Sequence, residues 1–113
     1  MRVRIGPYRK NRATRVEIEP HDTWSMDCTL ALIIHPMLVQ LKETTHGYPN
    51  QLTEERWNEI LDEMIWAFEQ KCRDDWMEDY YYNKWDQEGV KAHQDRMSNG
   101  FRLFGKYYEN LWD

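Results

Sequence analysis

The chain has 113 residues, which is enough for one domain and too few for two. Hydrophobic residues make up 41% of it and charged residues 31%, values typical of a soluble domain. The longest apolar run, residues 30–34, is far shorter than the ~20 residues of a membrane span, and the arginine-rich N-terminus lacks the apolar region of a signal peptide. We therefore expect a single domain over residues 1–113 that is neither exported nor embedded in a membrane.

Charge is unevenly distributed along the chain, whose net charge is −5. Residues 1–15 hold six of the 15 basic residues and none of the 20 acidic ones, so residues 16–113 carry a net charge of −11. The six are Arg2, Arg4, Arg9, Lys10, Arg12 and Arg15. They indicate either a contact with nucleic acid or an acidic partner, or a strand with merely solvated charges. We favour the strand, because apolar residues are interleaved with them.

Two short segments near the N-terminus, residues 2–5 and 14–19, alternate polar and apolar side chains. Gly6 and Pro7 open a turn-rich connection between them, and Pro20 ends the second segment. We predict a β-hairpin over residues 1–20. Its apolar face is too small to be stable alone, so we expect it to pack on helices formed by residues 21–113.

The densest apolar segment, residues 22–47, predicts a helix over residues 23–45 with an N-cap at Asp22 or Ser25. Apolar residues occupy most of its circumference, which is typical of the central helix of a domain. Pro36 removes one backbone hydrogen bond and costs roughly 3 kcal/mol inside a regular helix. We therefore expect this central helix to be kinked at Pro36.

Asp27 and His35 lie inside this apolar segment. Buried polar groups have to be paired, so we assign both residues to a structural polar core, with Asp27 bound by Trp or Tyr donors or by hairpin arginines. Cys28 and Cys72 have the spacing of neither a disulfide framework nor a zinc site.

A second helix is expected after Thr53, a typical N-cap residue followed by two glutamates. Its core stripe is Trp57, Ile60, Leu61, Met64, Ile65, Phe68 and Cys72. Trp66 projects about 180° from this stripe by helical geometry. It either packs under the hairpin or a loop, or contacts a partner.

Residues 74–88 mix acidic residues with Trp and Tyr, and both helical and extended conformations are open to them. A last helix is expected from about Asp86 to Leu111, with its stripe at Val90, His93, Met97, Phe101, Phe104, Tyr108 and Leu111. Gly100 and Gly105 flank this stripe, where a glycine allows another backbone to approach closely.

Three carboxylates of the second helix, Glu59, Asp62 and Glu63, have a spacing that can converge on a hard cation such as Mg²⁺. Small helical nucleotide pyrophosphohydrolases bind magnesium through EExxE followed by ExxD. This chain differs from that pattern, with one extra residue before Glu59 and a reversed second motif. A metal-dependent nucleotide-binding or nucleotide-hydrolysing protein is thus an alternative, and surface ion pairing is the other explanation of the cluster.

Several strings resemble a family of small uncharacterised proteins of tailed bacteriophages, including marine and cyanobacterial phages. They are RIGPY at Arg4–Tyr8, DTWSMDCTLA at Asp22–Ala31, LDEMIWAFE at Leu61–Glu69 and SNGFRLFGKYY at Ser98–Tyr108. The chain departs from the family pattern in a shorter connection after RIGPY and in Cys28, where a histidine is expected. The resemblance implies a phage protein in the cytoplasm of the infected bacterial host, and it implies no particular chemistry.

The sequence thus favours an α+β fold, with the hairpin packed on about three helices, and a non-catalytic phage accessory protein that binds a host or phage protein without a cofactor. The expected partner-binding residues are Trp66, Glu59, Asp62, Trp76, Tyr80, Tyr81, Tyr82 and Trp85. Besides the nucleotide alternative, the basic hairpin favours a nucleic-acid contact, and the acidic-aromatic residues 74–88 favour mimicry of DNA.

Overall fold

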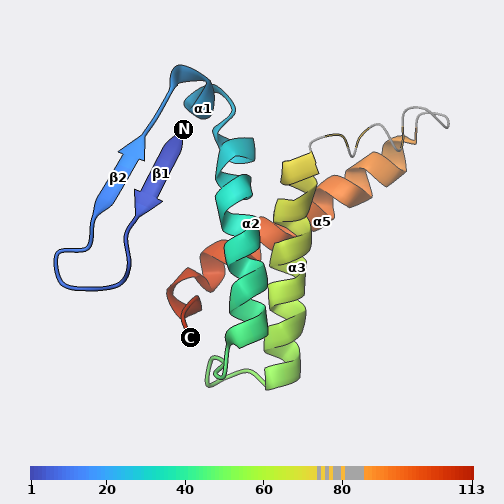
Figure 1. Cartoon of the computed structure of the whole chain (residues 1–113). Coiled ribbons are helices and arrows are strands. Elements are labelled where there is room, and N and C mark those ends of the chain that lie inside the picture. Colours follow the sequence, from blue (N-terminus) through green and yellow to red (C-terminus); the bar gives the residue numbers. More distant parts are fainter. Residues whose placement is uncertain (74, 76, 78–79, 81–85) are drawn as a thin grey trace.

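The computed structural model has an antiparallel β-hairpin at the N-terminus followed by helices, which confirms the α+β fold class (Figure 1). It describes residues 1–73, 75, 77, 80 and 86–113. Strand β1 spans Arg2–Ile5 and β2 spans Thr14–Glu17, with Val3 opposite Val16 and Arg4 opposite Arg15. In their connection, the amide of Gly6 donates to the carbonyl of Ala13 (2.8 Å) and Asn11 has a positive φ of 61°, a conformation that asparagine tolerates.

The helix expected over residues 23–45 is divided at Ser25 into α1 (Pro20–Trp24) and α2 (Met26–Thr44). Asp22 belongs to the capping box of α1, where its carboxylate accepts from the Glu19 amide (2.8 Å). Ser25 is the residue before α2, although its side chain makes no capping bond. α2 continues through Pro36, so the kink at this residue stays a prediction.

Helix α3 (Glu54–Arg73), rather than α2, holds the central position. It packs against α2 and against α5 (Gln87–Lys106), whereas α2 and α5 make no comparable contact with each other in the described part of the chain. Thr53 caps α3 as predicted, by accepting from the Arg56 amide (3.1 Å). The buried residues of α3 are Trp57, Ile60, Leu61, Met64, Ala67, Phe68 and Gln70. The expected central place of α2 is therefore wrong, because α3 has a partner helix on two sides.

Helix α5 approaches α3 closely at Gly100, where a Cβ atom would lie 2.4 Å from Ala67 Cβ and 2.7 Å from the Glu63 carbonyl oxygen. This confirms the predicted role of Gly100, whereas Gly105 has nothing within 4 Å of its Cβ position. The 3-10 helix η1 (Tyr108–Asn110) follows α5, so the predicted last helix ends earlier than Leu111.

The hairpin stands apart from the helices in Figure 1, and its strands make no close contact with any helix that the structure describes. Val3, Ile5, Val16 and Ile18 are all exposed. The Cα radius of gyration is 16.6 Å, whereas a compact domain of this length has about 13 Å. The expected packing of the hairpin on the helical body is thus not observed.

Candidate functional site

The three carboxylates proposed as a metal site pair with three different basic side chains. Glu59 pairs with Arg56 at 3.0 Å on its own helix, and Asp62 pairs with Lys42 of α2 at 2.5 Å. Glu63 accepts two hydrogen bonds from the Arg96 guanidinium of α5, at 3.0 and 3.1 Å. No group of three or more His, Cys, Asp or Glu side chains is arranged to hold a metal within the described ranges. The cluster therefore serves ion pairing, two of its members joining α3 to its neighbours.

Trp66 lies between α3 and α5 instead of projecting into solvent. Its half-buried ring is 4.9 Å from the His93 ring, and Arg96 Cζ lies 3.9 Å from the ring centroid. The guanidinium that covers Trp66 is the one that binds Glu63. Helical geometry places Trp66 opposite the core stripe of α3. Because α2 and α5 pack against two sides of α3, the contacting surface of this helix extends beyond that stripe and includes Trp66. Trp66 thus makes contacts between α3 and α5, and its role in partner binding stays a prediction.

A polar network extends this contact toward the start of α5. His93 Nε2 is 3.0 Å from Oε1 of Gln70, which is only 5% exposed, and His93 Nδ1 is 3.0 Å from the Tyr80 hydroxyl. Tyr80, another expected partner-binding residue, is therefore half-buried and bound within the protein. The remaining candidates, Trp76, Tyr81, Tyr82 and Trp85, lie outside the described residues, as does most of the acidic-aromatic stretch.

Asp27 and His35 differ in their surroundings. Asp27 is exposed and pairs with Lys71 of α3 at 2.8 Å, so its expected burial in a polar core is wrong. This hydrogen bond lowers the pKa of the Asp27 carboxyl below its ordinary value. His35 is half-buried on α2, and its structural role stays a prediction. Burial and the charge of Glu69 raise the pKa of the Cys72 thiol above its ordinary value, which favours the protonated form.

The basic residues of the hairpin lie away from the helical body. The strand register places Arg2, Arg4 and Arg15 on one face, with Val3, Ile5 and Val16 on the other. Arg15 pairs with Glu17 at 2.6 Å. Arg4 lies directly opposite Arg15, an arrangement of like charges that destabilises a strand pair unless another charge compensates it.

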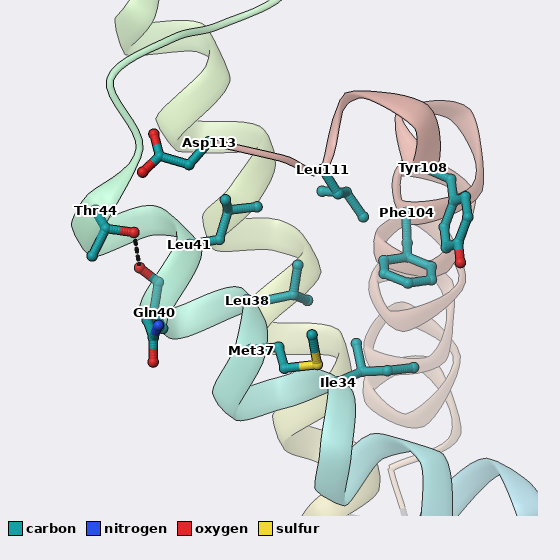
Figure 2. Close-up of a pocket in the computed structure, with 10 residues that line it drawn as sticks. All are labelled: Ile34, Met37, Leu38, Gln40, Leu41, Thr44, Phe104, Tyr108, Leu111 and Asp113. Atoms are coloured by element: carbon teal, nitrogen blue, oxygen red, sulfur yellow. Dashed lines mark hydrogen bonds between the residues drawn. The ribbon is translucent and has the colours of Figure 1, made fainter. Parts of the chain in front are cut away.

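An apolar groove of about 710 Å³ runs between α2 and the C-terminal residues (Figure 2). Figure 2 shows Leu38 and Leu41 of α2 on one wall and Phe104, Tyr108 and Leu111 on the other. Met37, at its edge, is 66% exposed. The acid Asp113 is the one charged residue among the described residues that line the groove. Its carboxylate accepts from the His46 amide (3.1 Å), which fastens the C-terminal residues to the loop after α2.

The apolar surface of the groove continues along α2 toward the hairpin. Met26, Leu30, Ile33 and Met37 are spaced at i, i+4, i+7 and i+11, which places them on one face of the helix. Met26, Leu30 and Met37 are exposed. We call these four residues the α2 stripe. The sequence of α2 is apolar around most of the helix, which is consistent with this exposed apolar face. The same pattern also predicts a helix that is covered on every side, and in the structure this face of α2 is open.

The chain matches no protein-family model, no curated protein and no solved structure. Its resemblance to phage proteins therefore stays a prediction. Within the described ranges, none of the helices combines the length and the apolar character needed to cross a membrane.

Proposed function

We propose that the protein acts by binding another protein, and that the groove between α2 and the C-terminal residues takes an apolar segment of the partner. The observation that carries this proposal is the groove itself, with its largely apolar walls and the exposed α2 stripe continuing from it. Exposed apolar surface of this extent is typical of protein interaction sites, because its burial against a partner is favourable.

The charge of the protein indicates the chemistry of that segment. Residues 16–113 carry a net charge of −11, and Asp113 lies at the groove. A positively charged segment with an apolar face is therefore attracted during the encounter and buries apolar area once it is bound. The same interaction weakens as salt is added, since salt screens exposed charges beyond about 10 Å.

Two lysine substitutions on one helix test this proposal. Met37 and Leu32 are 66% and 64% exposed, but Leu32 points away from the groove. To find the partner, a photo-crosslinking amino acid is placed at position 37 in cells that express the protein. The crosslinked partner is identified and purified, and its affinity for the protein is then measured by titration. We expect Met37→Lys to weaken its binding at least about tenfold, or 1.4 kcal/mol, and Leu32→Lys to leave it unchanged. Equal affinities for both variants would contradict the proposal.

The hairpin supports a second candidate function, a contact with nucleic acid. Its two strands form a ribbon clear of the body, and three arginines share one face. A two-stranded ribbon fits the major groove of B-form DNA. Glu17 on the same face already pairs with Arg15, and a phosphate would compensate the charge of Arg4 opposite it.

Titration of a labelled DNA duplex at increasing salt tests this candidate. The logarithm of the affinity should fall with the logarithm of salt concentration, and Arg4→Gln should reduce that slope by about 0.9 for one lost phosphate contact. Arg102→Gln, an exposed arginine on α5, is the matched control and should leave the slope unchanged. Binding that does not depend on salt, or equal slopes for both variants, rules the candidate out.

A further inference from the structure

The hairpin is an arm whose strands have no close contact with the described helices of its own chain, although the amino group of Met1, next to β1, pairs with Asp22 of α1 at 3.0 Å. We use the name arm for residues 2–18. Its apolar side chains Val3, Ile5, Val16 and Ile18 are 44–63% exposed, although a two-stranded hairpin is at best marginally stable without a surface to cover its apolar face. The radius of gyration of 16.6 Å exceeds that of a compact domain of this length. Among the residues that the structure describes, none covers the apolar face of the arm, which leaves that face open to another molecule.

The charge of the arm restricts what can cover it. The arm holds six basic residues and one acid, Glu17, for a net charge of +5, whereas residues 19–113 hold 9 basic and 19 acidic residues, for a net charge of −10. Two arms side by side would bring two such positive charges together, which opposes their pairing into a larger sheet. The helical body of another molecule of the same protein has the opposite charge.

The helical body offers a matching apolar surface. The α2 stripe and the adjoining groove lack a cover in the described part of the chain. They need an apolar segment with basic residues, which is the composition of the arm. The arm needs an exposed apolar surface on a body of opposite charge. The α2 stripe and the groove are apolar, with Asp113 at the groove, and residues 19–113 are acidic as a whole. Each surface therefore has the properties that the other requires.

We infer that the partner is a second copy of this chain, with the apolar face of each arm lying on the α2 stripe and groove of the other copy. This inference rests on the proposed function and names its partner. The exchange is reciprocal, so both molecules use the same two surfaces and the assembly closes as a two-fold dimer. Exchanging two arms also doubles the buried contact, which brings a small hairpin nearer to the size of a stable interface. The arginine face of each arm stays outward.

Sedimentation velocity over a range of protein concentrations tests the dimer. We expect a concentration-dependent dimer whose dissociation constant rises with salt, because salt screens the attraction between the basic arm and the acidic body. Val16→Lys on the arm and Met37→Lys at the groove should each weaken it at least about tenfold. Leu32→Lys should not. Circular dichroism shows that each variant is folded, as expected from the exposure of all three positions.

Mixing the two weakened variants separates arm exchange from any other dimer. In the dimer of either variant alone, both contacts carry a lysine. In the mixed dimer, the unaltered arm of Met37→Lys meets the unaltered groove of Val16→Lys, so one contact is intact and both lysines lie in the other. Because one buried lysine already removes most of a contact, the second adds little, and we expect the mixture to form dimer at concentrations where each variant alone is monomeric.

A mixture that stays monomeric while the wild-type protein dimerises overturns the arm exchange, and so does a wild-type protein that is monomeric at every concentration. If that monomer still binds a different protein in a manner sensitive to Met37→Lys, the proposed function stands without the inference. If it binds a DNA duplex through the arm instead, the arm belongs to the second candidate function and the inference is wrong.

Discussion

Replacing Gly100 by alanine tests the close packing of α3 on α5 at this residue. The added methyl group would lie 2.4 Å from Ala67 Cβ and 2.7 Å from the Glu63 carbonyl oxygen. The second of these atoms belongs to the backbone of α3, so it cannot rotate away. The helices have to separate, or the turn around Gly100 has to distort.

The expected size follows from two opposing effects. Overpacking a close contact costs typically 1–3 kcal/mol, whereas alanine in place of glycine stabilises a helix by roughly 0.5–1 kcal/mol. With the contact to a backbone atom, the strain should exceed the gain in helix propensity. We expect Gly100→Ala to lower the free energy of unfolding by about 1–2 kcal/mol, which corresponds to a fall in Tm of very roughly 4–16 °C.

Gly105→Ala on the same helix is the matched control. Its Cβ position has nothing within 4 Å, so only the helix propensity changes and the variant should be as stable as the wild type or up to about 1 kcal/mol more stable. Urea unfolding followed by circular dichroism measures both, with equal m-values required for the comparison. A Gly100→Ala variant as stable as Gly105→Ala would refute the close approach of α3 and α5.

Two other substitutions test the ion pairs between helices. Arg96→Leu removes both the pair with Glu63 and the guanidinium over Trp66. It should lower the free energy of unfolding in urea by about 1 kcal/mol and shift the tryptophan fluorescence. An unchanged unfolding midpoint and an unchanged spectrum would contradict this contact. Asp27→Asn removes the exposed pair with Lys71 and should cost up to about 1 kcal/mol at pH 7. The hydrogen bond to Lys71 lowers the pKa of Asp27 in the folded state. The stability lost in Asp27→Asn is therefore largest above the ordinary carboxyl pKa and disappears as the pH falls through the lowered pKa of Asp27. A difference in unfolding free energy between variant and wild type that stays constant down to pH 2 would show that the pair contributes nothing.

The elements of this fold could be predicted from local sequence patterns. Alternation gave the strands, the N-cap Thr53 gave the start of α3, and Gly100 marked a close helix contact. The arrangement of the elements could not be predicted in the same way. An almost wholly apolar helix such as α2 is consistent with a central position and equally with an exposed binding face, and only the contacts of α3 on two sides decide between them.

The surroundings of Trp66 could not be predicted for the same reason. The angle of Trp66 on an isolated helix leaves both packing and a partner contact open, because it does not include α5, which brings His93 and Arg96 to the ring. The groove joins residues of α2 to Phe104 and Leu111, which are far apart in sequence. Periodicity within one element carries no information on such a pairing of surfaces.

The most direct test of the account is the ratio of two dissociation constants. Met37→Lys and Leu32→Lys place the same charge at nearly equal exposure on one helix, inside and outside the groove. For the self-association of the protein, we predict that Met37→Lys raises the dissociation constant at least about tenfold more than Leu32→Lys does. A ratio near one, with both variants folded, would contradict the assignment of the α2 stripe and groove as the binding surface.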